Sequence, residues 1–197
     1  MYKSKEIRWF KDHPDKDIIE WFAQKGQTFE NTKSRTDYYM PLDKNDIAIK
    51  LREGKIEIKQ RMGEPREGNL SPDAVGIFEN YIKWSFVACQ LDELSQQIMT
   101  KNPYNWIEAV KIRIGVKVTE DTSGKRQIVS IKDYVDFGCQ IEYTSLELKA
   151  KTIYTFSLEW FGDKEPELPP SLIQEIIGSA TMKIQDSMGY AENLRRI

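Results

Sequence analysis

The chain contains the run Ile47-Ala48-Ile49-Lys50-Leu51-Arg52, in which apolar and charged residues alternate. Successive side chains of a strand point to opposite faces, so Lys50 and Arg52 share one face and Ile49 and Leu51 share the other. A strand face that carries spaced cations indicates contact with a ligand that has several negative charges.

Two further runs repeat this alternation. Ile56–Arg61 places Glu57, Lys59 and Arg61 on one face, and Val110–Ile114 places Lys111 and Arg113 together. When such strands pair, the charges form rows across the sheet. We interpret the rows as an anion site; the alternative is a solvated basic face whose cations pair with Glu6, Glu57 and Glu142.

The composition is that of a globular protein with one core. The 197 residues are 40% hydrophobic and 30% charged, which predicts one domain over residues 1–197, with 166–197 as a C-terminal connector and helix. The formal net charge of −2 argues against a general nucleic-acid binder, since such proteins are usually basic. A basic site must therefore be local.

Signals for export or membrane insertion are not found in the sequence. The first residues have no apolar centre of a signal peptide, and no apolar run reaches the length of a membrane span. Cys89 and Cys139 lack metal-ligand spacing and lie in apolar runs, so we expect reduced core cysteines. These features predict a cytoplasmic protein with neither membrane nor nucleic-acid partners.

The order of expected elements favours an α+β fold. A helix is expected after Pro14, a long one from Ser71 to Met99 on the spacing of Val75, Phe78, Ile82 and Phe86, and a last one after Ser171, with an exposed loop over 62–70. Strands are expected over residues 5–10, 35–40, 47–52, 56–61, 108–119, 126–132, 139–149 and 152–161.

Hairpin connections between consecutive strands imply antiparallel pairing. One open sheet with helices behind it would suffice if the charged faces looked toward solvent. A closed barrel or tunnel, with a polar, basic lumen and helices packed outside, explains the repeated cation pairs better and removes the sheet edges.

Several short segments, taken in order, resemble the CYTH-like, or triphosphate tunnel metalloenzyme, superfamily. They are Glu6-Ile7-Arg8, Asp37-Tyr38-Tyr39, Ile49–Gly54, Ile58–Arg61, Lys111-Ile112-Arg113 and Phe156–Glu159. The resemblance covers most of residues 3–162 and implies an antiparallel tunnel of about eight strands. It further implies a small polyphosphate or an organic triphosphate as ligand, with Mg²⁺ or Mn²⁺ as cofactor. Members include inorganic triphosphatases, thiamine triphosphatases and class IV adenylyl cyclases.

The same resemblance implies roles for individual residues. Binding of the phosphates falls to Lys50, Arg52, Lys59, Arg61, Lys111, Arg113 and Arg8. Metal binding and catalysis fall to Glu6, Glu57 and Glu159.

The chain departs from the family pattern where metal ligands are expected. The family's opening signature is Glu-x-Glu-x-Lys, and here those places hold Glu6, Arg8 and Phe10. An arginine cannot ligate a hard divalent cation and its charge repels one. The closing strand offers Glu159 where two spaced glutamates are usual; Glu142 and Glu147 on the preceding strand are candidates to compensate.

Two functions remain open at this stage. The first is metal-dependent hydrolysis of a triphosphate or short polyphosphate, a reaction that relies mainly on positioning and charge neutralisation. The second is a binding or sensing module of the same fold in which catalysis is impaired, and the Arg8 and Phe10 departures favour it.

Overall fold

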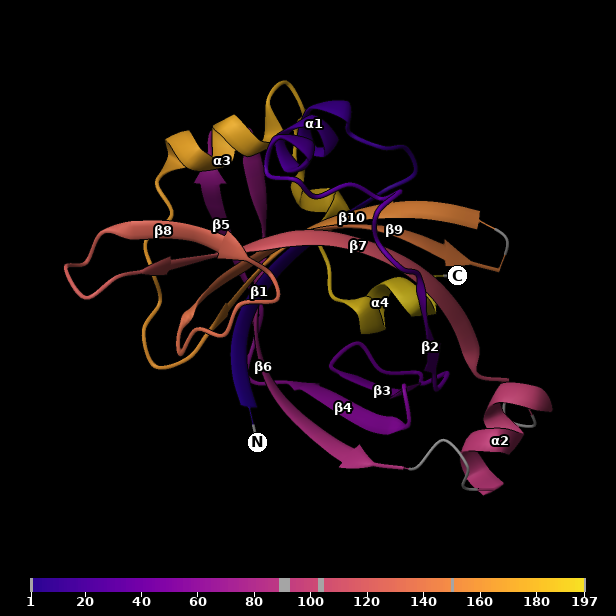
Figure 1. The fold of residues 1–197 in the computed structure, drawn as a ribbon. Helices are drawn as coiled ribbons and strands as arrows, with labels where there is room; N and C mark the ends of the chain where they lie inside the picture. The colour runs from indigo at the N-terminus through magenta and orange to yellow at the C-terminus, as the bar shows by residue number, and fades with distance from the viewer. Residues whose placement is uncertain (1, 89–92, 103–104, 150, 197) are drawn as a thin grey trace.

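Eight antiparallel strands close into a barrel in the computed structural model, which describes residues 2–88, 93–102, 105–149 and 151–196 (Figure 1). The order around the barrel is β1-β10-β9-β7-β2-β3-β4-β6, and β6 pairs with β1 to complete the ring. The strands are β1 (Tyr2–Lys11), β2 (Arg35–Tyr39), β3 (Ile47–Arg52), β4 (Lys55–Arg61), β6 (Ala74–Val87), β7 (Ile107–Glu120), β9 (Gly138–Leu148) and β10 (Lys151–Phe161). The predicted α+β antiparallel barrel is thereby confirmed.

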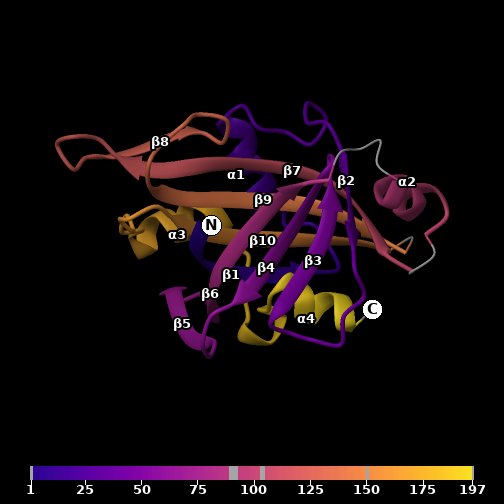
Figure 2. The same ribbon diagram turned by 90° about the horizontal axis from the view of Figure 1, so that it is seen from below.

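Two strands and four helices complete the fold. β5 (Arg66–Ser71) pairs with β6, and β8 (Arg126–Ser130) pairs with β7. The helices are α1 (Lys16–Gln24), α2 (Glu93–Thr100), α3 (Pro170–Ile177) and α4 (Tyr190–Arg195), with a 3-10 turn over Ile184–Asp186. Figure 2 shows β3, β4 and β6 crossing one side of the molecule, with α2 near the start of β7. No helix within these described ranges is long and apolar enough to cross a membrane.

The main hydrophobic core lies outside the barrel. Trp9, Ile141 and Leu158 belong to β1, β9 and β10, and they pack with Phe22 of α1 and Ile173 of α3. Because strand side chains alternate, burying these residues outward turns their neighbours Arg8, Glu142 and Glu159 into the lumen. The hydrophobic packing on one face of the sheet therefore fixes the charged face inside the barrel.

The predicted long helix over Ser71–Met99 is wrong. Residues Ala74–Val87 form strand β6, Glu93–Thr100 is the helical part among the described residues of this range, and the expected loop over 62–70 contains most of β5. Phe86, expected on the buried side of that helix, is 54% exposed. The reason is that Tyr81, Lys83 and Ser85 alternate with the apolar residues Ile82, Trp84 and Phe86 at the period of a strand.

The C-terminal region contains one helix more than the sequence predicts. α3 lies outside the barrel as expected, whereas α4 falls within the outline of the ring in Figure 1 and lies at one end of the barrel in Figure 2. Of the two cysteines, Cys139 is free and buried in the main core, and Cys89 lies outside the described residues.

Candidate functional site

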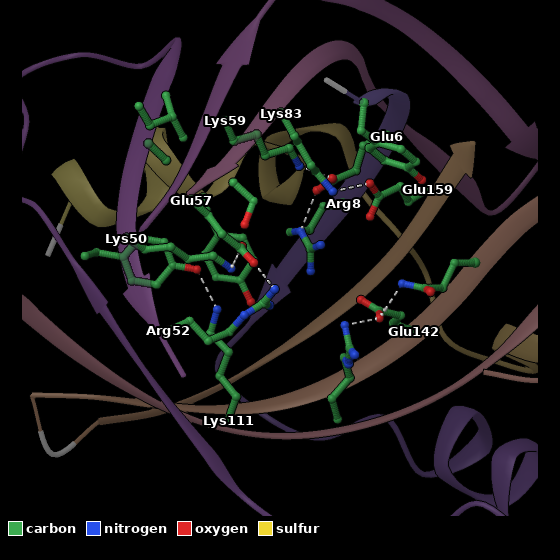
Figure 3. A pocket seen from close by; sticks show the side chains of 18 of the residues that line it. Glu6, Arg8, Lys50, Arg52, Glu57, Lys59, Lys83, Lys111, Glu142 and Glu159 are labelled. Atoms are coloured by element: carbon green, nitrogen blue, oxygen red, sulfur yellow. Dashed lines mark hydrogen bonds and ion pairs between the residues drawn. The ribbon is translucent and has the colours of Figure 1, made fainter. Parts of the chain in front are cut away.

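The interior of the barrel holds a cavity of about 530 Å³, lined by side chains from all eight barrel strands. This volume lies within the range of roughly 300–1,000 Å³ that is usual for small-ligand sites. Figure 3 shows charged side chains from opposite walls converging on it.

The lining of this cavity is basic. It contains eight cationic side chains and four carboxylates, an excess of four positive charges when all are ionised, in a chain whose net charge is −2. The cations are Arg8, Arg35, Lys50, Arg52, Lys59, Lys83, Lys111 and Arg113, and the carboxylates are Glu6, Glu57, Glu142 and Glu159.

Most residues proposed from the sequence as phosphate ligands line this cavity. They are Arg8, Lys50, Arg52, Lys59, Lys111 and Arg113. Arg61 differs, because its guanidinium pairs with Glu79 at 2.8 Å, next to the Gly189 backbone that leads into α4. It therefore contributes to the wall near α4 and not to the cavity lining.

One buried carboxylate is shared by three cations. Asp37, which is fully buried on β2, lies 3.0 Å from the Nζ of Lys111, 3.3 Å from that of Lys50 and 3.5 Å from the Nε of Arg35. Burial alone would raise the pKa of Asp37, but Lys111 and Lys50 outweigh it and hold this pKa well below its usual range. Three cations thus share one buried counter-ion, and of these Lys50 also pairs with Glu57.

The two lysines of this group are poorly solvated. Burial lowers the pKa of Lys50 from 10.5 to about 8, with Asp37 opposing the shift and Lys111 adding to it. Burial lowers the pKa of Lys111 to about 8 as well, with Asp37 opposing and Arg35 adding. Both ammonium groups are therefore under-compensated by the carboxylates around them.

Three arginines gather beside this group. Arg52 pairs with Glu57, which also accepts from Lys50 at 3.0 Å. Burial lowers the pKa of Arg35, and the charges of Arg113 and Arg52 lower it further. The Nε of Arg35 also has no hydrogen-bond partner in the described part of the chain. This combination indicates a place where a bound anion would be stabilised.

The opposite wall holds the first predicted metal ligand in ion pairs. Glu6 pairs with Lys59 and lies 3.0 Å from the Nε of Arg8, whose Nη1 donates to the Oγ1 of Thr155 at 2.9 Å. Burial would raise the pKa of Glu6, but Lys59 and then Arg8 outweigh it and lower the pKa below its usual range. Glu6 is therefore an ionised counter-ion for two cations.

Two further pairs lie along the same wall. Glu159 pairs with Lys83, and the pKa of Glu159 is lowered because Lys83 and Lys59 outweigh the effect of burial. Glu142 accepts from Arg113 at 2.6 Å and from the side-chain amide of Gln140 at 2.7 Å. Glu147, the other compensating carboxylate considered from the sequence, is exposed.

The three predicted metal ligands do not converge. Glu6 and Glu159 are direct cross-strand partners, whereas Glu57 belongs to the separate group with Lys50 and Arg52. Among the residues the structure describes, no group of three or more His, Cys, Asp or Glu side chains is arranged to hold a metal ion. Because Mg²⁺ and Mn²⁺ need oxygen ligands and both adjacent glutamates are neutralised by cations, the donor set does not fit a resident ion.

Sequence reasoning missed four residues of this site. Arg35 and Asp37 share the inward face of β2 with Tyr39, an alternation that was visible in the sequence. Lys83 was missed because the sequence predicted a helix where strand β6 forms. Tyr190, on the six-residue helix α4, had no periodic signal because the helix is too short.

No family model matches the chain, and no curated protein matches it.

Proposed function

We propose that the barrel lumen binds a linear polyphosphate or an organic triphosphate, and that the chain is a divergent member of the CYTH-like superfamily. The observation that carries the proposal is a cavity of about 530 Å³ lined by eight cations and four carboxylates, an excess of three positive charges once the buried Asp37 is also counted. Guanidinium groups bind two phosphate oxygens at once and ammonium groups add point charge, so alternating Arg and Lys suit a chain of phosphates.

Competing small anions fit this lining less well. A single sulfate or orthophosphate can neutralise only part of the excess, whereas a triphosphate can contact the Arg35, Arg52 and Arg113 group and Lys111 together. The under-compensated charges around Asp37 are therefore best matched by several linked phosphates.

The replacement Arg52→Ala is expected to weaken tripolyphosphate binding by about tenfold or more, since it removes a charged hydrogen-bonding group from the cavity wall. Isothermal titration calorimetry measures this change. Arg126→Ala, at an exposed arginine of β8, is the matched control and is expected to bind as the unaltered protein does. Equal affinities for all three proteins would contradict a lumen site.

Hydrolysis of a phosphoanhydride bond is the second candidate function. The observation that favours it is the direct pairing of Glu6 and Glu159 across β1 and β10 within the basic lumen. The ion pairs of both glutamates count against it, so we expect weak phosphate release together with persistent ligand binding.

The replacement Arg8→Glu is expected to raise Mg²⁺- or Mn²⁺-dependent phosphate release from tripolyphosphate on the order of tenfold. It exchanges the cation beside Glu6 for a carboxylate, which adds an oxygen ligand and removes a repelling charge. A phosphate-release assay measures the rate, and Arg8→Gln, which only removes the charge, is the control. This account would be refuted if the unaltered protein released phosphate rapidly and Arg8→Glu left that rate unchanged or lowered it.

A further inference from the structure

The lumen cations become more buried along one direction. The side chains of Lys83 and Arg113 are each 32% exposed, those of Lys59 and Arg52 are 22% and 23% exposed, and that of Lys50 is 17% exposed. Two cations are nearly inaccessible: Arg8 at 7% and Lys111 at 3%. The cavity therefore has an open end and a deep end.

The deep end is closed by one aromatic ring. The ring of Tyr190 lies 4.6 Å from the guanidinium of Arg8 and 4.0 Å from the Nζ of Lys111. It stacks on Tyr39 and meets Phe10 edge to face. The two deepest cations thus rest on a ring supplied by α4.

Below Tyr190 the inner face of the barrel changes from charged to apolar. Leu194 of α4 packs there against a cluster of apolar side chains from the strands. The cluster contains Phe10, Tyr39, Ala109, Leu146, Leu148 and Ile153. An ionised polyphosphate cannot enter such a layer without losing its solvation, which is unfavourable for any buried charge.

A second cavity lies beside α4. Its volume is about 410 Å³, and Ala191, Leu194 and Arg195 of α4 contribute to its wall. It shares Tyr39 and Ala48 with the lumen cavity, so the two cavities adjoin next to α4.

The segment that leads into α4 is fixed to the barrel. Ser187 forms a bridge with Trp9 of β1, and its hydroxyl accepts from the backbone N–H of Ile77 on β6 at 2.8 Å. A side chain at Gly189 would collide with the Tyr81 hydroxyl, so the backbone passes tightly against the wall. On the far side, Arg195 pairs with Asp43 at 2.8 Å.

We infer that the lumen is a blind site that captures the end of a polyphosphate chain, with Tyr190 setting its depth. This inference rests on the proposed function and adds the class of ligand: a linear phosphate chain with a free terminal phosphate. A terminal phosphate carries close to two negative charges at neutral pH, more than an internal one, and it is matched to the paired cations Arg8 and Lys111 at the floor.

The unaltered protein tests the inference directly. Linear polyphosphates of short, medium and long defined length are titrated, and the number of protein molecules per chain is measured by analytical ultracentrifugation. Capture of ends predicts at most one protein molecule at each chain end, whatever the length. A number that rises in proportion to length overturns the inference, and so does cyclic trimetaphosphate, which has no terminal phosphate, binding as tightly as linear tripolyphosphate.

A pair of variants tests the role of the ring. Tyr190→Ala removes the ring on which Arg8 and Lys111 rest, so the ratio of the affinities for linear tripolyphosphate and cyclic trimetaphosphate is expected to fall by about tenfold. Tyr190→Phe keeps the ring and is expected to leave this ratio unchanged. An unchanged ratio in folded Tyr190→Ala would contradict a depth-setting role. If tripolyphosphate fails to bind the unaltered protein at all, the proposed function itself is refuted, whereas length-proportional binding refutes only the capture of ends.

Discussion

Replacing Asp37 with asparagine is expected to lower the free energy of unfolding by about 3–5 kcal/mol, the usual effect of removing one partner of a buried ion pair. Asp37 is fully buried and is the shared counter-ion of Arg35, Lys50 and Lys111. Without its charge, three cations repel one another in a poorly solvated place. Denaturant unfolding followed by intrinsic tryptophan fluorescence measures the change.

The matched control for this prediction is Glu165→Gln at the exposed pair between Lys5 and Glu165, for which the expected loss is below about 1 kcal/mol. Tripolyphosphate is expected to restore more stability to Asp37→Asn than to the unaltered protein, because the ligand supplies the missing negative charge. A loss for Asp37→Asn as small as that of the control would mean that the three cations do not depend on this carboxylate.

The barrel walls were predictable because alternation is a local signal. In Ile49–Arg52 of β3, Ile56–Lys59 of β4 and Val110–Ile114 of β7, apolar and charged residues alternate, and the structure turns Lys50, Lys59 and Lys111 inward as expected. The prediction for the segment that forms β6 was wrong because Val75, Phe78, Ile82 and Phe86 are also spaced as on one face of a helix. The polar positions of the same segment, such as Glu79 and Lys83, were the signal that distinguishes the two periods.

The composition of the site was less predictable than the fold, because it depends on contacts between residues distant in sequence. Lys59 meets Glu6 across a separation of 53 residues, and Lys111 meets the Tyr39 hydroxyl across 72. The residues next to Glu6 in sequence do not indicate that it pairs with Lys59. Those next to Phe10 do not indicate that it packs on Tyr190, which lies near the C-terminal end of the chain. The aromatic residue at position 10 has a structural role, since its ring supports Tyr190 of α4.

The affinity for tripolyphosphate is expected to fall steeply as the pH rises above about 8. Lys50 and Lys111 titrate near 8 in the free protein, and a bound polyanion favours their protonated forms and raises both pKa values. Below about pH 8 both lysines are charged in either state, so affinity is constant. Above it, each binding event must take up protons, which lowers affinity by about tenfold per lysine for one pH unit beyond the free pKa.

Lysine-to-arginine variants separate the effect of lysine ionisation on affinity from the effect of the ligand's own ionisation. Arginine stays protonated throughout this range, so Lys50→Arg and Lys111→Arg are each expected to reduce the decrease in affinity between pH 7 and pH 9 by about tenfold. Calorimetry at several pH values measures it. The stability of the free protein moves in the opposite direction: both pKa values lie below the ordinary 10.5, so the unfolded chain binds more protons between about 8 and 10.5, and these lysines make the folded state more stable as the pH rises through that window. An affinity with the same pH profile in the unaltered protein and in both variants would exclude these lysines from the binding site.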